Sequence, residues 1–249
     1  METVIKAQDI SFSYGGEPIL YNIGFSVNKG DFIAVTGANG SGKSTLMKLM
    51  LGEIQLQRGN IWLFGTEIRN FKHWPKIGYV PQNGTARAGG FPATALEIVR
   101  LNLYSNCGLM RFPTKALYKN ADEALKLVGM QDYSKRLIGD MSGGQQQRVM
   151  IARVLAGEPE LMLLDEPTTG IDAESAQSLY MLLSKLNRER KLTIIMITHD
   201  IARAADYVNR TLCLEEGSIV ELMREQILTE QYHRHKHPQR SAENNDEHI

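Results

Sequence analysis

The sequence predicts an α/β protein built around a mainly parallel sheet. Short apolar segments that suit buried strands alternate with longer amphipathic segments that suit helices, first over residues 31–50 and again over residues 161–221. A glycine-rich turn joins the first of these strands to its helix. Strands that alternate with helices favour parallel pairing, because each helix carries the chain back to the edge from which the next strand starts.

The elements before the helical region can be assigned in order. Residues 4–14 and 23–27 mix β-branched, aromatic and polar side chains, as half-exposed strands do. Residues 31–36 then contain a short apolar strand. The helix after the glycine-rich turn begins near Gly42 and carries Leu46, Leu49 and Met50 at helical spacing.

The middle of the chain departs from the strand–helix alternation. Residues 83–92 are rich in Gly, Ala, Thr and Pro, which indicates a loop, and residues 95–103 and 114–128 are predicted helices. We therefore expect a helical insertion over about residues 84–150. The alternation then resumes with strands at 161–164, 193–198, 210–215 and 218–221 and helices at 173–188 and 201–205.

These boundaries predict one large domain over residues 1–228 and a polar, flexible tail over residues 229–249. Lys plus Arg and Asp plus Glu number 28 each, which argues against a mainly electrostatic nucleic-acid binder. A helix that spans a membrane needs about 20 mostly apolar residues, and no apolar run in the sequence approaches that length. No secretory signal is evident either. Cys107 and Cys213 lack C-x-x-C spacing and are expected to be packed residues, so the composition predicts a cytosolic protein.

The glycine-rich turn satisfies a phosphate-binding motif. Residues 37–44 read GANGSGKS, which matches G-x-x-x-x-G-K-S/T between the strand and the helix that this motif requires. We expect its backbone N–H groups to face phosphate oxygens, Lys43 to bridge the β- and γ-phosphates, and Ser44 to bind Mg²⁺. A glycine-rich turn without a ligand is the alternative. The predicted nucleotide contacts here are Gly37, Asn39, Gly40, Ser41, Gly42, Lys43, Ser44 and Thr45.

The apolar strand at residues 161–164 is followed by two carboxylates, Asp165 and Glu166. Alternation along a strand sends neighbouring side chains in different directions, so the two can have different roles. Asp165 is predicted to hold Mg²⁺, directly or through water, and Glu166 to orient the attacking water and accept its proton. An acidic surface pair is the alternative, which the fully apolar strand disfavours.

A second helix N-terminus can also receive phosphate. Residues 142–144 read SGG and precede a helix with Val149 and Ile151 on its apolar side. With this element, the chain resembles the nucleotide-binding subunits of ABC transporters over about residues 3–222. The residues Ser142, Gly143, Gly144 and Gln145 resemble that family's signature motif.

Four further motifs carry the resemblance. Gln82 resembles the Q-loop glutamine, His199 the switch histidine, Asp172 the D-loop aspartate and Tyr14 the aromatic that stacks on adenine. Taken alone, His199 would more often be a helix-capping or packed histidine, and Tyr14 more often an aromatic on a sheet surface. The resemblance places Gln82 near Mg²⁺ or water, His199 at the γ-phosphate, and Asp172 within the nucleotide site.

The resemblance implies a P-loop NTPase core with a mainly parallel sheet, an N-terminal antiparallel β subdomain and an inserted helical subdomain. It implies an ATPase that uses ATP and Mg²⁺ and forms a head-to-tail homodimer. Each ATP would lie between residues 37–45 of one chain and residues 142–145 of the other. An integral membrane permease would insert a coupling helix near the loop after Gln82, which places the chain peripherally at the cytoplasmic face of the membrane.

The substrate is indicated by a narrower resemblance. Residues 91–99, 107–113 and 124–130 resemble segments of bacterial zinc- and manganese-type metal importers. They imply import of a divalent metal ion with an extracellular or periplasmic metal-binding protein. An importer ATPase for another substrate, such as an iron chelate, is an alternative, and a non-transport ABC ATPase module is a second. The interval over residues 45–142 has no room for the long coiled coil of chromosome-organising relatives.

The tail contains alternating histidines, His233, His235 and His237. Three imidazoles at this spacing could be presented to Zn²⁺, which makes a metal-binding tail that senses the ion one hypothesis. The alternative is a solvated basic segment, because Arg234 and Lys236 repel a cation.

Overall fold

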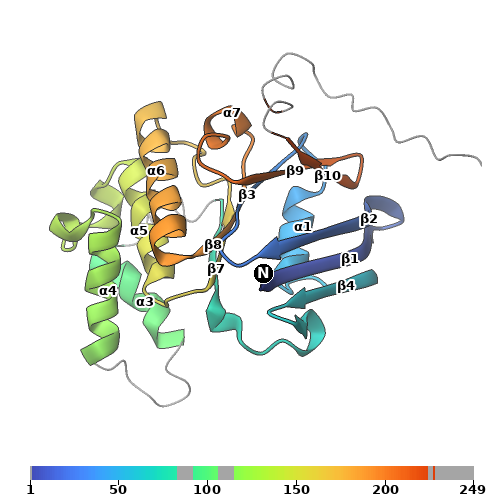
Figure 1. Ribbon diagram of the computed structural model, residues 1–249. Helices are drawn as coiled ribbons and strands as arrows, with labels where there is room; N and C mark the ends of the chain where they lie inside the picture. The colour runs from blue at the N-terminus through green and yellow to red at the C-terminus, as the bar shows by residue number, and fades with distance from the viewer. Residues whose placement is uncertain (1, 83–91, 106–114, 224–226, 228–249) are drawn as a thin grey trace, which may run out of the picture.

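The computed structural model describes residues 2–82, 92–105, 115–223 and 227. Within these residues the strands form two sheets, and all the helices but the first lie on one side of the larger sheet (Figure 1). The described residues include no helix that is long and apolar enough to cross a membrane.

The larger sheet has six strands in the order β10-β9-β3-β8-β7-β6, and only the β9–β10 pair is antiparallel. Its central strands are apolar and buried, as expected for parallel strands covered on both faces. The bounds are β3 (Phe32–Thr36), β6 (Ile77–Val80), β7 (Leu161–Asp165), β8 (Thr193–Ile197), β9 (Arg210–Glu215) and β10 (Ser218–Leu222).

Alternate residues of these strands enter two separate apolar clusters. Phe32, Leu164 and Met196 pack with the helices α3, α4, α5 and α6, whereas Val35 and Leu163 pack with α1 and the smaller sheet. Figure 1 shows the resulting order, with the helices on one side of the large sheet and the smaller sheet and α1 on the other. The helices are α1 (Lys43–Met50), α3 (Ala95–Ser105), α4 (Lys115–Leu127), α5 (Gly143–Leu155), α6 (Ala173–Arg190) and α7 (Ile201–Ala204).

The smaller sheet is antiparallel and has the order β2-β1-β4-β5. Its strands are β1 (Thr3–Tyr14), β2 (Glu17–Asn28), β4 (Arg58–Leu63) and β5 (Thr66–Glu67). Register shifts between β1 and β2 accompany left-handed backbone at Asp9 and Asn22, so this hairpin is bulged.

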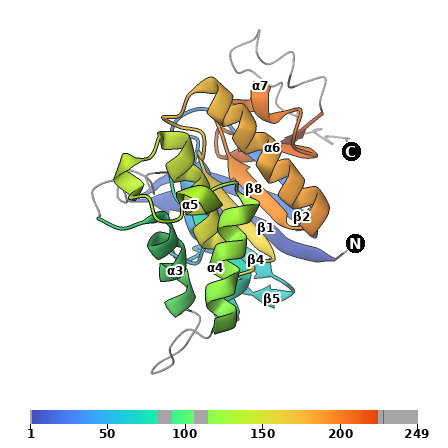
Figure 2. The same cartoon turned by 90° about the vertical axis from the view of Figure 1, so that its left-hand side faces the viewer.

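The helices of the inserted region, α3, α4 and α5, contact one another, and α5 also contacts α6. Figure 2 shows them from the helical side of the molecule. Short 3₁₀ turns occur before and within this region. They are Ile68–Asn70, Trp74–Lys76, Gln131–Tyr133 and Ile138–Asp140.

The predicted fold class is confirmed, and the predicted strands and helices occur within one or two residues of their expected bounds, except that β2 begins at Glu17, six residues before its expected start at residue 23. Strands β4, β5 and β6 were not expected. One geometric expectation was wrong. Glu166 does not continue β7, which ends at Asp165, and its φ of 46° is left-handed. The direction of the Glu166 side chain relative to Asp165 is therefore set by this turn of the backbone and not by strand alternation.

Candidate active site

The loop between β3 and α1 curls around the side chain of its own lysine. The Lys43 ammonium donates to the carbonyl oxygens of Gly37 at 2.8 Å and Ala38 at 2.7 Å. Gly37 and Gly42 have φ values of 143° and 102°, and a Cβ added at Gly37 would overlap the carbonyl oxygen of Leu214. Only glycine fits such a close approach of two backbone segments, which explains the motif's first position.

The electrostatics of this loop favour an anionic ligand. Burial lowers the pKa of the Lys43 ammonium, while the carboxylate charges of Glu166 and Asp165 oppose that shift. A phosphate beside Lys43 would also favour its charged form. The Ser41 Oγ is buried and has no hydrogen-bond partner among the described residues, so it is free to donate to a phosphate oxygen. These features fit the predicted phosphate cradle.

The groups predicted to hold Mg²⁺ also have suitable chemistry. Burial and the neighbouring charge of Glu166 raise the pKa of Asp165, although Lys43 and Lys48 act in the opposite direction. A divalent cation would relieve both causes of this shift. The Ser44 side chain is exposed at the start of α1 and offers a hydroxyl oxygen.

Three side chains from separate loops meet at one oxygen of Glu166. Its Oε2 accepts hydrogen bonds from Gln82 Nε2 at 3.0 Å and Thr169 Oγ1 at 2.8 Å. His199 Nδ1 lies 3.3 Å from the same oxygen. The structure thus brings together Gln82, Glu166 and His199, which the sequence predicted separately as parts of one hydrolytic site.

Thr169 was not predicted as a site residue. Its hydroxyl bonds the Glu166 carboxylate, and its backbone N–H donates to the Glu166 carbonyl oxygen at 3.2 Å. The available signal was the spacing, because a hydroxyl three residues after a carboxylate can close a tight turn back onto it. Thr169 therefore fixes the rotamer of Glu166 from within the same loop.

The signature residues form the N-terminus of α5. Ser142 is the N-cap, and its Oγ accepts from the Gln145 N–H at 3.3 Å while Gln145 Oε1 accepts from the Ser142 N–H at 3.1 Å. A Cβ added at Gly143 would lie 3.2 Å from Ile171 Cγ2, and one added at Gly144 would lie 2.8 Å from Ser175 Cβ. This N-terminus is thus packed tightly onto the loop before α6 and its first turn.

Helix α5, which begins with the signature residues, and helix α1, which follows the phosphate loop, lie on different faces of the large sheet. Helix α5 packs in the helical cluster, whereas α1, which follows the phosphate loop, packs with the smaller sheet. Figure 1 shows the two helices on opposite sides of the large sheet. This arrangement is compatible with the expected head-to-tail pairing, in which each nucleotide contacts the two elements in different chains.

Two further predicted residues occupy exposed positions. Tyr14 ends β1 with half of its surface exposed, and its ring meets Phe12 edge to face with the ring centroids 4.9 Å apart. Asp172 is the N-cap of α6, where its Oδ1 accepts from the Ser175 N–H at 2.8 Å and this bond lowers the pKa of Asp172. The Tyr14 ring is thus accessible for stacking, and the Asp172 carboxylate is held ionised.

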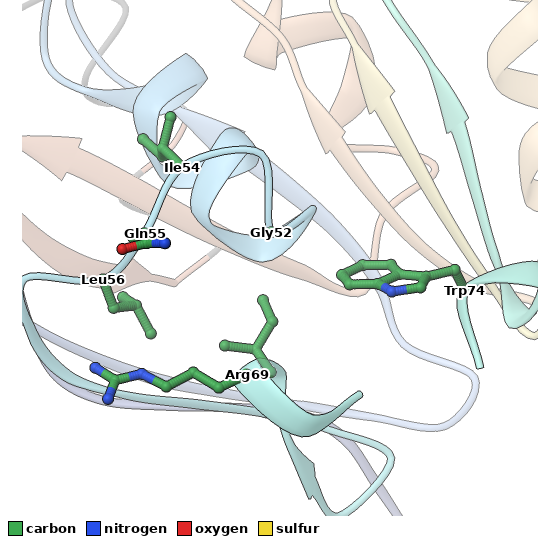
Figure 3. A pocket seen from close by; sticks show the side chains of 7 residues that line it. Gly52, Ile54, Gln55, Leu56, Arg69 and Trp74 are labelled. Atoms are coloured by element: carbon green, nitrogen blue, oxygen red, sulfur yellow. The ribbon is translucent and has the colours of Figure 1, made fainter. Parts of the chain in front are cut away.

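Other cavities and residues lie apart from this site. A pocket of about 540 Å³ (Figure 3) is bordered by Trp74, Arg69 and residues after α1. None of the predicted nucleotide contacts lines it. Cys213 is buried, as expected. Cys107, His233, His235 and His237 lie outside the described residues, and within the described part of the chain no three His, Cys, Asp or Glu side chains form a metal-binding group.

The comparisons with known proteins agree with this geometry. A family model described as ABC transporter matches residues 20–169. The chain is 44% identical over 221 residues to the zinc uptake system ATP-binding protein ZurA of Listeria monocytogenes, covering 89% of this chain and 86% of that protein. It is 36% identical over 225 residues to the manganese transport system ATP-binding protein MntB of Bacillus subtilis, covering 90% and 88%.

Solved structures give the same result. A metal-chelate type ABC transporter in an inward-facing conformation matches with a TM-score of 0.80 and 30% identity, over 92% of this chain and 86% of that one. A bacterial ABC transporter cassette solved as a dimer matches with a TM-score of 0.72 and 29% identity, over 88% and 99% of the two chains.

Proposed function

The chain belongs to the ABC transporter family and is an ATP-binding, energy-coupling ATPase subunit, and we propose that the transport it drives is the import of zinc or manganese. The observation that carries the ion assignment is the identity to a zinc uptake ATPase subunit, 44% over most of both chains. The solved metal-chelate type transporter is less similar, at 30% identity. An iron chelate is therefore the second candidate substrate.

We propose the following roles in hydrolysis. The loop over residues 37–45 holds the phosphates, with Lys43 at the β- and γ-phosphates and the Ser41 hydroxyl as a further donor. Bound at Ser44, Asp165 and Gln82, Mg²⁺ would neutralise charge on the β- and γ-phosphates. Glu166 orients the attacking water and accepts its proton.

The contacts of Glu166 support this assignment. Gln82, Thr169 and His199 fix one carboxylate oxygen, Oε2, which leaves the carboxylate in one orientation for a water molecule. His199 is more than half exposed, so its ring also has an accessible surface for a γ-phosphate. The left-handed backbone of Glu166 is the kind of strain that is found at catalytic positions.

The proposed assembly has four parts. Two copies of this chain form a head-to-tail dimer in which Ser142, Gly143, Gly144 and Gln145 of one copy contact the nucleotide of the other. The dimer binds an integral membrane permease at the cytoplasmic face, and an extracellular or periplasmic protein delivers the ion. Each chain uses residues 1–228 as its ATPase domain, with residues 229–249 as a separate tail.

Replacing Glu166 with glutamine tests the hydrolytic part of this proposal. The Glu166→Gln variant keeps the shape of the side chain but loses the base, so we expect ATP binding to persist, turnover to fall at least 100-fold and the ATP-bound dimer to accumulate. Glu189→Gln on the exposed end of α6 is the matched control and should hydrolyse normally. Wild-type turnover in Glu166→Gln removes Glu166 from the role of base.

Uptake measurements test the substrate. In cells that lack this chain, we expect Zn²⁺ or Mn²⁺ uptake to fall and to be restored by the wild-type chain but not by Glu166→Gln. Unchanged uptake of both ions together with lost uptake of a ferric chelate selects the second candidate. If solubilised membranes yield no permease with the tagged wild-type chain, the transport assignment is wrong.

A further inference from the structure

The two loops that carry Glu166 and His199 lie side by side at the carboxyl ends of β7 and β8. The backbone N–H of Glu166 donates to the carbonyl oxygen of Ile197, the last residue of β8, at 3.0 Å. The side chains of Glu166 and His199 then meet at 3.3 Å. Their geometry therefore depends on how the two loops are placed relative to each other.

A tyrosine hydroxyl from α6 lies between these loops. Tyr180 Oη is 3.4 Å from Thr168 Oγ1 and 3.3 Å from Thr198 Oγ1. Thr168 follows Glu166 by two residues, and Thr198 directly precedes His199. Thr198 Oγ1 also accepts from the Asp200 N–H at 3.1 Å. Three hydroxyls thus connect the loop after β7 to the loop after β8.

The ring of Tyr180 is held in place by apolar packing. The side chain is fully buried, and its ring stacks on Tyr207 with centroids 5.6 Å apart and planes 13° apart. Both rings pack in the helical core cluster. A phenylalanine would make the same apolar contacts, so packing alone does not explain the hydroxyl. A buried hydroxyl costs stability unless it is hydrogen-bonded, which ties its position to the two threonines.

We propose that Tyr180 is a positioning residue for ATP hydrolysis, acting through Thr168 and Thr198 to hold Glu166 and His199 in their relative orientation. Tyr180 touches neither of them. The proposal rests on the hydrolytic roles assigned above to Glu166 and His199. Both hydroxyl contacts are longer than the usual O–H···O distance of about 2.5–3.0 Å, so the expected contribution to kcat is modest and not all-or-none.

Tyr180→Phe is the first test. We expect kcat to fall about threefold to tenfold, as for the loss of one or two net hydrogen bonds in the transition state, while KM for ATP stays within about twofold. The melting temperature should stay close to that of the wild type, because the ring and its stacking remain. Tyr207→Phe is the matched control, since it removes a hydroxyl from the same ring stack outside the hydroxyl chain, and its kcat should be that of the wild type.

A second pair of variants changes Thr198, one of the two threonines that contact the Tyr180 hydroxyl. Thr198→Val removes the hydroxyl at nearly constant shape and should lower kcat as Tyr180→Phe does, whereas Thr198→Ser keeps the hydroxyl and should restore it. In a Glu166→Gln background, Tyr180→Phe should cause a smaller further loss than in the wild type, because one member of the oriented pair is already disabled. A purely structural role predicts the same loss in both backgrounds and a lowered melting temperature.

The outcomes separate this inference from the proposed function. If Glu166→Gln hydrolyses ATP at the wild-type rate, the hydrolytic roles themselves are wrong. If Glu166→Gln is inactive but Tyr180→Phe retains full kcat, or raises KM with kcat unchanged, the positioning role of Tyr180 is overturned and the hydrolytic roles stand.

Discussion

Replacing Gly144 with alanine should destabilise the fold through one specific contact. Gly144 lies in the first turn of α5, and its added Cβ would lie 2.8 Å from both the Cβ and the Oγ of Ser175 in the first turn of α6. Carbon atoms prefer a separation of about 3.5–4.0 Å, so the new methyl group is too close by about 1 Å. Rotation of the Ser175 hydroxyl cannot relieve the clash, because the Cβ is fixed by the helix backbone.

The magnitude follows from two opposing terms. Overpacking of this kind costs about 1–3 kcal/mol, while alanine in place of glycine inside a helix gains up to about 1 kcal/mol. Taking the middle of the overpacking range, about 2 kcal/mol, and subtracting a gain of up to about 1 kcal/mol leaves a net loss of about 1–2 kcal/mol. At this chain length, that loss lowers the melting temperature by roughly 2–8 °C.

The Ser175→Gly substitution isolates the contact. It removes both clashing atoms but keeps the backbone N–H that Asp172 accepts. In the Ser175→Gly background, Gly144→Ala should therefore stabilise the chain, because only the gain in helix propensity remains. Thermal and urea unfolding of the wild type, both single variants and the double variant measure this reversal of sign.

Two results contradict the reasoning. If Gly144→Ala melts at or above the wild-type temperature, α5 and α6 are not packed as closely as described. If Gly144→Ala is equally destabilising with Ser and with Gly at position 175, the loss has another origin than this contact.

Three further substitutions test the active site. Lys43→Ala should weaken ATP binding at least tenfold by equilibrium titration, since it removes the buried ammonium from the phosphate loop, and unchanged affinity would count against the cradle. Asp165→Asn should abolish Mg²⁺-dependent hydrolysis yet raise the melting temperature of the nucleotide-free chain at pH 7.5. Burial raises the pKa of Asp165 above its ordinary value of 3.8, so ionisation of Asp165 destabilises the folded wild type as the pH rises above 3.8. The gain in melting temperature of Asp165→Asn should therefore shrink as the pH falls toward 3.8. A gain that does not change with pH would exclude this cause. Thr169→Val should lower kcat about tenfold through loss of a charge-assisted hydrogen bond to Glu166, Thr169→Ser should retain activity, and equal kcat in the two would show that the hydroxyl is dispensable.

The elements predicted best from the sequence are those whose burial is complete. Every residue of β3 and β8 is buried, so their apolar runs are visible without any knowledge of the fold. By contrast, β4 begins with three polar or glycine positions, β5 has two residues and β6 has four. Strands β4 and β6 form because β1 and β7 offer pairing edges, and such partners distant in sequence leave little local signal. Strand β5 pairs with β4 and is too short to show a pattern.

The residues of the site also differ in whether their contacts are local in the sequence or distant. The phosphate loop is local, since Gly37 and Lys43 are set by the geometry of one turn, and its motif identifies it. The contacts that orient Glu166 come from residues 3, 33 and 84 positions away in the chain. In the sequence, Tyr180 is indistinguishable from the other residues on the apolar face of α6. Its hydroxyl contacts both Thr168 and Thr198 only because β7 pairs with β8. Motifs thus identify which residues react, whereas the residues that orient them require the fold.

Helix α6 connects the two ends of the proposed mechanism within one chain. In its first turn Ser175 packs against the signature glycine Gly144, and one and a half turns later Tyr180 reaches the loops of Glu166 and His199. One helix therefore carries both the residue that packs on the signature glycine and the hydroxyl that joins the two catalytic loops, so the orientation of this hydrolytic pair and the placement of the signature residues rest on the same element.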